Sequence, residues 1–456
     1  MPDMALHADI KTKAGTNHTI YLSARHTKQL GFKIGETVRI NYADRKVNVK
    51  IKKSTNKDLI ISSDVLNMLK LHANLPVIYD RHKVHGTIEL YLRRPVIGVL
   101  AKKTGPRENP FKGNSNFFKA LTERGKEIGV DVIFFSSKDF NHRTGNIRPW
   151  FWNPLKSRWL RKKKTIPLPD AIYDRDPNVN PIFRQELEQI RPFVNPHEFS
   201  ELTNDRHQTH KALHKSGIRH NTKTKQPKTS HASPKNIETF VNQYGHAFLK
   251  HNSNNKGTVK CRKKKHDPKG NHHYELAYDL RQGTSFVRKH IIARSSNLNN
   301  KLNQVIDLVN PKSSSEDYVV QQPIEAATYE NRSFEVRVTT HRNRNSRFTH
   351  NRSTRSWNKK GKATNHDTDT LINDIWGNKN KVQKNIDKTV DDTVKAIEKH
   401  LGKRVGEVGV DICLDNKGTP YIINLDSHAD NRDIAIEHPL QYALRLAKKK
   451  HNSIST

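Results

Sequence analysis

The segment from Gly406 to Asp426, which reads GEVGVDICLDNKGTPYIINLD, constrains the fold more than any other part of the chain. Apolar and polar residues alternate along its first half, as they do in a β-strand that has one buried face. The letters NKG then mark a tight turn, and a second apolar-rich run follows it. The segment therefore predicts a β-hairpin with one apolar face and one polar face.

The polar face of this hairpin is rich in oxygen-bearing side chains. If residues 417 and 418 form a two-residue turn, Asp411 lies opposite Asn424, and Asp426 shares a face of the returning strand with Asn424 and Ile422. Carboxylate and amide oxygens on neighbouring strands suit Mg²⁺. Asp and Asn are also the commonest turn formers, so a metal site is favoured only if other nucleotide-binding elements accompany the hairpin.

The length of the chain, 456 residues, predicts two or three domains. Residues 1–92 contain short alternating runs such as ETVRINYA and KVNVKIKK, bounded by Gly, Asn or Asp. Such runs predict a small β-rich module, either a barrel or a sandwich. A short helix is expected within DVLNMLKL, because Val65, Met68 and Leu69 recur there at helical spacing.

Residues 93–197 have the pattern of an α/β domain. VIGVLAKK and VDVIFFSS are continuous apolar runs, as is typical of buried parallel strands. The segment between them, NSNFFKALTERGKEIG, has one apolar face at helical spacing. Strand, helix and strand in this order predict a right-handed βαβ unit with a parallel sheet.

Residues 198–456 are expected to form the third domain, which contains the hairpin. Between Asn378 and Leu401, apolar residues recur every three or four positions, which predicts a long amphipathic helix. A second helix is expected from about His438, with Pro439 in its first turn. The fold class is therefore α/β with α+β character, in a multidomain chain.

The charge of the chain is strongly basic, with 82 Lys and Arg against 45 Asp and Glu, formally +37. Such a field attracts polyanions, whether nucleic acid, acidic protein or anionic polymer, without choosing among them. Basic residues gather in the runs Lys250–His272 and Val336–His366. These runs are either solvated tails or, where strands interrupt them, the lining of one basic groove.

Two cysteines, Cys261 and Cys413, stand far apart, which argues against a disulfide framework or a cysteine-rich metal site. The start, MPDMALHADI, has no apolar signal-peptide core, and no stretch approaches the length of a membrane span. We therefore expect a cytoplasmic protein without a signal peptide or a membrane span.

The order of several motifs resembles the YheC/YheD group, endospore coat-associated proteins of spore-forming bacteria in the ATP-grasp superfamily. The resemblance covers nearly the whole chain. Its motifs are RRPVIGVLAKK, NSNFFKAL, VDVIFFSS, PLPDAIYDRDP, VNPHEF, YGHAFLKH, YVVQQPI, SFEVRV and the hairpin itself. It implies a β-rich module (1–92), an α/β pre-ATP-grasp domain (93–197) and an ATP-grasp nucleotide-binding domain (198–456), with a mother-cell or spore-associated location.

The resemblance also implies site residues and two cofactors, ATP and Mg²⁺. Arg337, in the family's D-x-R position, is expected to face the γ-phosphate or an acyl-phosphate intermediate. Lys250 is expected to contact the nucleotide phosphates. Cofactor-binding positions are Lys250, Gly257, Gln321, Gln322 and Ile324, of which the last three lie where the strand passes the adenine; the metal-binding positions are Asp411, Asn424 and Asp426.

The chain departs from the family pattern at the places where phosphate and metal bind. His251 replaces a proline, and Asn254 and Asn255 stand near the expected Gly and Ser of a glycine-rich loop, of which Gly257 remains. Glu335 replaces the Asp of D-x-R. The family's Glu-x-Asn is inverted to Asn424-x-Asp426, and His428-Ala429 replaces the Lys-Pro that commonly follows.

Three functions remain open at this point. The first is an ATP-dependent carboxylate–amine (or similar) ligase that acts on an unknown acidic or carboxylate substrate. The second is a diverged, non-catalytic basic scaffold of the spore coat, with coat proteins or an anionic polymer as partners. The third is a non-specific binder of nucleic acid or another polyanion, although the sequence contains no helix-turn-helix, zinc-finger or aromatic RNA-binding signature.

Overall fold

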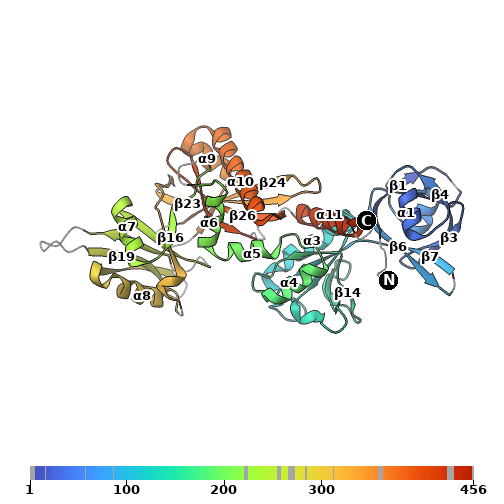
Figure 1. The fold of residues 1–456 in the computed structure, drawn as a ribbon, viewed down its shortest axis with the longest axis horizontal. Coiled ribbons are helices and arrows are strands. Elements are labelled where there is room, and N and C mark those ends of the chain that lie inside the picture. Colours follow the sequence, from blue (N-terminus) through green and yellow to red (C-terminus); the bar gives the residue numbers. More distant parts are fainter. Residues whose placement is uncertain are drawn as a thin grey trace. The chain divides into compact units, whose positions relative to one another are not determined.

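The computed structural model describes residues 6–15, 17–56, 58–85, 87–219, 224–253, 258–264, 273–282, 285–311, 313–357, 363–428 and 436–453. The chain divides into two compact units, whose elements are labelled in Figure 1. Unit 1 comprises Met1–Val194, Arg342–Arg347 and Ala435–Thr456, and unit 2 comprises Asn195–His341 and Phe348–Ile434. The limits of the three expected domains stay a prediction.

The N-terminal part of unit 1 is a closed β-barrel, one of the two alternatives that the alternating runs predict. Its strand order is β1-β5-β2-β4-β3-β7-β6. The bounds are β1 Leu6–Lys13, β2 Thr19–Ser23, β3 Thr37–Tyr42, β4 Arg45–Ser54, β5 Leu59–Ser62, β6 Pro76–Val84 and β7 Thr87–Arg93.

Two short helices join strands of the barrel. The helix α2, Ser63–Leu69, confirms the expectation for DVLNMLKL. The helix α1, Ala24–Leu30, was not predicted; it begins after Ser23, whose hydroxyl accepts a hydrogen bond from the backbone N–H of His26, and ends at Gly31 with φ 66°. Seven residues are too short a window for apolar periodicity to show a helix, so its caps are the only local signal.

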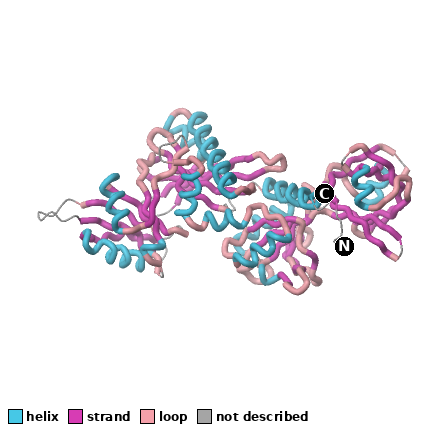
Figure 2. The backbone as a smooth tube through the Cα atoms, viewed as in Figure 1, coloured by secondary structure: helices cyan, strands magenta, loops and turns pink. Residues whose placement is uncertain are grey.

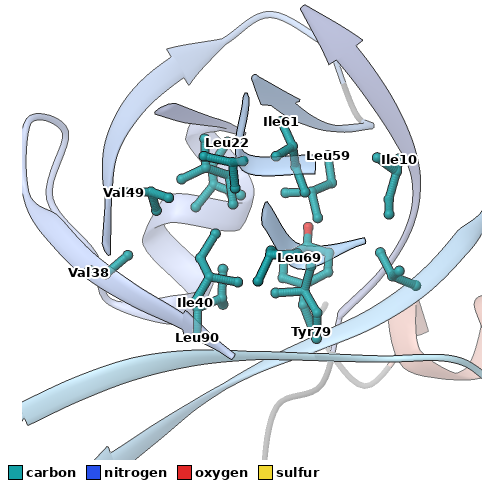
Figure 3. Close-up of a cluster of buried hydrophobic side chains, with 14 of the residues drawn as sticks. Ile10, Leu22, Val38, Ile40, Val49, Leu59, Ile61, Leu69, Tyr79 and Leu90 are labelled. Carbon is teal, nitrogen blue, oxygen red and sulfur yellow. The ribbon is translucent and has the colours of Figure 1, made fainter. Parts of the chain in front are cut away.

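The interior of the barrel is apolar. Figure 3 shows the inward-pointing side chains that fill it, and their residues are almost completely buried. The labelled ones are Ile10, Leu22, Val38, Ile40, Val49, Leu59, Ile61, Leu69, Tyr79 and Leu90. Alternation along the strands thus places one set of residues in a single core.

The rest of unit 1 is built around a sheet of order β13-β12-β9-β8-β15. Its strands are β8 Val96–Leu100, β9 Asp131–Phe135, β12 Trp150–Asn153, β13 Arg158–Arg161 and β15 Ala171–Asp174. The strand β8 pairs in parallel with β9 and with β15, which confirms the predicted βαβ unit. The helices are α3 Ser115–Glu127, α4 Pro181–Ile190 and α11 Glu437–Ser453, and short strands β10 Phe140–Asn141, β11 Asn146–Ile147 and β14 Ile166–Pro167 form a separate sheet.

Unit 2 contains two sheets, and the first has the order β16-β21-β17-β18-β19-β20. Its strands are β16 Thr229–His231, β17 His246–His251, β18 Val259–Lys263, β19 His273–Gln282, β20 Ser285–Arg294 and β21 Tyr318–Gln321. The helices α7, Pro234–Tyr244, and α8, Leu298–Val309, share one buried apolar cluster with these strands. Figure 1 shows both helices beside this sheet.

The second sheet of unit 2 has the order β25-β24-β23-β26-β27 and contains the predicted hairpin. Its strands are β23 Arg332–Arg342, β24 Phe348–Trp357, β25 Ala363–His366, β26 Glu407–Leu414 and β27 Pro420–Asp426, and β22, Thr328–Tyr329, pairs with β23. The basic run from Val336 therefore lies largely in strands, at least over the residues that the structure describes.

The helices α9, Thr368–Trp376, and α10, Lys379–Leu401, pack on the apolar face of this second sheet. The helix α10 confirms the prediction from the spacing of Val382, Ile386 and Val390, all of which are buried. The helices α5, His197–Thr203, and α6, Arg206–Lys215, begin unit 2. Figure 2 shows helices and strands throughout both units, so the fold is mixed α/β.

Among the residues that the structure describes, no helix has the length and apolar character that a membrane crossing requires.

Candidate functional site

The polar face of the second sheet places three of the predicted site residues in one row. Arg337 on β23 pairs with Asp411 on β26, and Asp411 pairs with Asn424 on β27. Side chains directly opposite one another on adjacent strands have their Cβ atoms about 5 Å apart. The strand register alone therefore brings Arg337, Asp411 and Asn424 together. Arg337 and Asn424 are 87 positions apart in the sequence, so no local sequence pattern predicts that they meet.

The hairpin pairs Asp411 with Asn424, as predicted, but the turn and the strand between them differ from the prediction. Leu414 pairs with Pro420, so the turn is longer than the two-residue turn that we expected. A β-bulge between Asp411 and Ile412 then adds one residue on β27 and restores the pairing of Asp411 with Asn424. The long turn and the bulge compensate for each other.

The bulge also corrects the face predicted for Ile422. This residue pairs with Ile412 and lies in the apolar core, not beside Asn424 and Asp426. The extra residue, Ile423, breaks the two-residue alternation, so the residues on either side of it do not follow one face.

Arg337 holds both carboxylates of the predicted metal site. Its Nη1 donates to both oxygens of Asp411, at 2.9 and 3.0 Å, and its Nη2 donates to Asp426 Oδ2 at 2.7 Å. The Asn424 amide nitrogen donates to Asp411 Oδ2 at 3.0 Å. Arg337 and Asp411 are each only 15% exposed at the side chain, so the ion pair between them is largely shielded from water, whereas Asp426 is 38% exposed.

Gly409 makes room for the guanidinium group. It lies two residues before Asp411 on β26 and pairs with Asp426. A Cβ atom at Gly409 would lie 2.5 Å from Nη2 and 2.8 Å from Cζ of Arg337. Because both ends of the guanidinium are held by carboxylates, it cannot give way without loss of an ion pair.

The charges of the first sheet extend this cluster. Lys250, on β17, has its pKa lowered by burial and by the charge of Arg206, an effect that Glu335 opposes. Burial, and then the charge of Asp411, raise the pKa of Glu335, whereas the charges of Lys250 and Arg206 lower it. Lys250 of the first sheet and Arg206 of α6 therefore act on carboxylates of the second sheet at a single place.

Arg206 is a member of this cluster that the sequence reasoning missed. It is the first residue of α6 and is 7% exposed. Its backbone N–H donates to the carbonyl of Asn252 and its Nε to the carbonyl of His251, each at 3.0 Å. Burial lowers the pKa of its guanidinium, and the charges of Asp411 and Glu335 counter this. The residue order Asp205-Arg206, a helix N-cap followed by a cation, was the available signal.

The last residue of β17 is His251, which stands where the family pattern has a proline. Its Nδ1 accepts a hydrogen bond from the backbone N–H of Ser253 at 3.1 Å, and its Nε2 lies 3.3 Å from Ser313 Oγ. Both contacts fix the start of the segment that follows β17. Gly257, and with it Asn254 and Asn255, lies outside the described residues.

The three residues expected to pass the adenine differ from one another. Gln321 is buried in β21, and its side-chain nitrogen lies 3.2 Å from His210 Nε2 and 3.3 Å from Thr229 Oγ1. The backbone N–H of Gln322 donates to the carbonyl of Lys228, so it is already used. No hydrogen bond among the described residues uses the backbone N–H of Ile324.

A cavity of about 700 Å³ lies beside this segment. Ile324 and Gln322 line one side of it, and the turn of the hairpin lines another. Tyr421 contributes an aromatic ring, with Lys225 Nζ 5.3 Å from its centroid. The cavity is within the size range of small-molecule sites and offers an aromatic wall with a free backbone donor at Ile324.

The oxygen atoms of Asp411, Asn424 and Asp426 fit a hard cation. Asn424 uses its amide nitrogen toward Asp411, so its carbonyl oxygen is left for another partner. The guanidinium of Arg337 already bridges the two carboxylates as a cation would. No cluster of three or more His, Cys, Asp or Glu suited to a metal occurs in the described part of the chain, so the amide of Asn424 is needed to complete the set.

Comparisons with known proteins identify the family of the chain. The model of the YheC/D like ATP-grasp family matches residues 195–449. The endospore coat-associated protein YheD of Bacillus subtilis (strain 168) is 26% identical over 134 residues. That match covers 29% of this chain and 27% of YheD, so the chain spans about a quarter of the length of that relative.

Solved structures with similar folds have low identity to this chain. N5-carboxyaminoimidazole synthetase from Staphylococcus aureus is 11% identical, with 77% of each chain covered and a TM-score of 0.44. D-alanyl-alanine synthetase A from Vibrio cholerae O1 biovar eltor str. N16961 is 10% identical, with 76% of this chain and 93% of that chain covered and a TM-score of 0.42. The family model, by contrast, matches more than half of the chain, and the protein belongs to the YheC/D-like ATP-grasp family.

Proposed function

We propose that the protein binds MgATP on the polar face of the β23–β26–β27 sheet and uses it to join a carboxylate to an amine or a similar nucleophile. The observation that supports this most is the meeting of Lys250, Arg206 and Arg337 with Glu335 and Asp411. Such a cluster is not needed for a stable fold, because the burial of charged groups costs hydration free energy. Clusters of this kind are more typical of functional sites.

Each residue has a role in this proposal. Lys250 and Arg206 offset the charge of the nucleotide phosphates, and Arg337 stabilises the phosphoryl group in transfer. Ile324 donates its backbone N–H to the adenine in the cavity described above. The side-chain oxygens of Asp411, Asn424 and Asp426 would hold Mg²⁺, which would supply positive charge to offset the charge of the phosphates.

The reaction proceeds in two steps. A carboxylate oxygen of the substrate attacks the γ-phosphorus of ATP, the bond to the bridging oxygen breaks, and ADP leaves with the electron pair. The amine nitrogen then attacks the acyl carbon, and inorganic phosphate leaves while the amine loses a proton. The substrate is an acidic or carboxylate-bearing molecule, and spore-coat components in the cytoplasm of a sporulating cell are the partners that we propose from the name of the B. subtilis relative.

Arg337 must exchange partners for the site to work. Nη1 of this residue donates to both oxygens of Asp411, and its positive charge would repel a cation there, so we propose that the guanidinium turns away from Asp411 in the working site. The transferred phosphoryl group is the new partner that we propose for Arg337. Binding of metal and of nucleotide are therefore expected to support each other.

Thermal unfolding with ATP, with and without Mg²⁺, tests the proposal. A ligand at 100 times its Kd stabilises the folded state by about 2.7 kcal/mol. We expect ATP to raise Tm only with Mg²⁺, and Asp411→Ala to abolish the rise. Asp279→Ala, which removes an exposed carboxylate of β19, is the matched control and should respond as the parent does. No rise at millimolar MgATP, or an equal rise in Asp411→Ala, would refute the proposal.

A second candidate is a non-catalytic basic scaffold that binds an acidic coat component. The occupation of Asp411 and Asp426 by Arg337 favours it, because this network is complete without a metal ion. The net charge of +37 would attract such a partner. Non-specific binding of nucleic acid would follow from the same charge and would disappear at moderate salt. Under this candidate, MgATP leaves Tm unchanged in the parent and in both variants.

A further inference from the structure

A second cavity in unit 2 lies among α6, the segment before β16, and α7, and has a volume of about 800 Å³. It shares Gln243 with the cavity near Ile324, but none of the charged residues of the candidate site. Its lining residues are His207, His210, Lys211, His214, Lys215, Gln226, Pro227, Lys228, Thr229, Ser230, Asn236, Thr239, Phe240 and Gln243.

The lining of this cavity is basic, with three lysines, three histidines and no carboxylate. Lys211, Lys215 and Lys228 form no ion pair with a carboxylate in the parts of the chain that the structure describes. Elsewhere many cations have a carboxylate partner, as Arg184 has in Asp174 and Lys388 has in Asp392. Three ammonium groups around one hollow without an internal counter-ion form a field that favours an anionic occupant.

The lysines stand on two sides of the cavity. Lys211 and Lys215 are four residues apart on α6, so they lie on one face of the helix, one turn from each other. Lys228 comes from the segment before β16. Its backbone is fixed, because its N–H donates to Gln322 Oε1 at 3.1 Å and its carbonyl accepts from the backbone N–H of Gln322. The cations are therefore held around the cavity rather than along a flat surface.

Two of the three histidines, His207 and His210, form a more buried wall. His210 is 8% exposed and its Nδ1 lies 2.7 Å from Gln226 Oε1; burial lowers its pKa to about 4. His207 is 7% exposed, and its Nδ1 has no hydrogen-bond partner among the described residues. Burial also lowers the pKa of His207. Burial favours the neutral form of both rings, so the positive charge comes from the lysines. Both ring nitrogens of His210 already have partners, Gln226 and Gln321, so His207 is the ring that can form a hydrogen bond to a ligand.

We propose that this cavity binds a small molecule that has at least two anionic groups, either phosphoryl or carboxyl. The volume is that of a small-molecule site rather than of a polymer track. The lining has lysines and no arginine, and lysine binds phosphate as a point charge without the planar fork that favours bidentate pairing. Thr229, Ser230 and Asn236 add neutral groups for hydrogen bonds to the same ligand.

Calorimetric titration of the full chain tests this proposal, with sodium pyrophosphate and sodium citrate as probes. Both titrations are done at constant ionic strength, without nucleotide and without Mg²⁺. We expect saturable binding of at least one probe, and a loss of about tenfold or more in affinity for Lys211→Gln/Lys215→Gln. Lys228→Gln, on the other side of the cavity, should weaken the same probe. Binding of pyrophosphate alone identifies a phosphoryl ligand, and binding of both probes identifies a site for either anion.

Two controls separate this cavity from the general charge and from the nucleotide site. Lys381→Gln/Lys384→Gln removes two exposed lysines of α10 that do not line the cavity, and should change the affinity by less than about twofold. Lys250→Met should also leave probe binding in place. The proposal is wrong if neither probe binds, if the Lys211 and Lys215 variant binds as the parent does, or if either control weakens the probe equally. Failure of the parent to bind MgATP would leave this result unaffected.

Discussion

The barrel of unit 1 and the polar face of the β23–β26–β27 sheet differ in how many charged side chains lie together. In the barrel, the carboxylate of Glu89 has local partners: it accepts a hydrogen bond from Asn41 Nδ2 at 2.9 Å and pairs with Arg39 Nη1 at 3.1 Å. The neighbouring residue Leu90 faces the other way, into the apolar cluster that fills the barrel. On the polar face of the sheet, by contrast, the charges of Arg337, Asp411 and Glu335 interact with two further cations, Lys250 of the first sheet and Arg206 of α6.

This difference separates residues that the fold needs from residues that it does not need. An apolar interior stabilises the barrel directly, through the area that it removes from water. A cluster of partly buried charges stabilises little overall, because the loss of hydration offsets the attraction, yet removal of one member is costly. Such a cluster therefore points to function, and its members should differ from barrel residues in what their replacement changes.

The largest expected effect on stability is in the barrel. Ile61→Ala removes a fully buried side chain and should lower the free energy of unfolding by about 4 kcal/mol, measured by urea denaturation. The affinity for MgATP of the protein that remains folded should not change. Ile34→Ala, at a residue that is 51% exposed in the same unit, is the control and should have little effect. A loss of nucleotide affinity in Ile61→Ala would contradict the separation of the two regions.

Arg337→Met should lower the free energy of unfolding by about 3 kcal/mol, because it leaves Asp411 and Asp426 without their cation. Arg288→Met removes a bidentate partner of Asp279, but there the two side chains are 66% and 45% exposed. Exposed pairs contribute less than about 1 kcal/mol, so this control should be nearly silent. If both variants lost the same free energy of unfolding, the buried ion pairs of Arg337 would contribute no more to stability than an exposed pair does.

The buried ring of His210 in unit 2 should make the free energy of unfolding depend on pH. Its pKa is about 4 in the folded protein and 6.5 in the unfolded chain, so the unfolded state binds more protons between these values. Stability is complete above pH 6.5 and falls as the pH drops toward 4, by about 3 kcal/mol for this residue. His210→Gln should lose that much less between pH 7 and pH 4 than the parent does. His214→Gln, at an exposed position of the same helix, should keep the dependence of the parent.

The smallest of these effects concerns Gly409. Gly409→Ala places a methyl group against the Arg337 guanidinium and should cost about 1 to 2 kcal/mol, measured by urea denaturation. Gly113→Ala, where an added Cβ meets no atom within 4 Å, is the control. If Gly409→Ala is as stable as the parent, the guanidinium is not held as tightly as its hydrogen bonds imply.

Sequence periodicity was sufficient where the structure depends on local repeats. The helix α10 and the parallel pairing of β8 with β9 follow from the spacing and clustering of apolar residues. The pairing of Asp411 with Asn424 was also predicted correctly, but a β-bulge was needed to compensate for a longer turn. A β-bulge depends on how the strand bends within its sheet, and the alternation of apolar and polar residues in one hairpin does not predict that bend.

Long-range pairing was beyond the sequence pattern. Nothing local shows that Arg337 lies opposite Asp411, or that Arg206 reaches the end of β17. The β19–β20 hairpin was also missed, because its strands lie beside a basic run that composition alone describes as solvated. Contacts between distant segments come from packing, so the hairpin residues were predicted together, whereas their contacts with Arg337, Lys250 and Arg206 were not.

The affinity for MgATP of Lys250→Met tests the central claim most directly. Lys250 lies at the meeting point of the two sheets, where its charge acts on Glu335 and Asp411. Lys289→Met removes an exposed lysine of β20 and changes the net charge equally. In calorimetric titrations at constant salt, we expect Lys250→Met to bind MgATP about tenfold more weakly or worse and Lys289→Met to bind as the parent does. Equal affinities in all three proteins would contradict the assignment of the nucleotide site to this face.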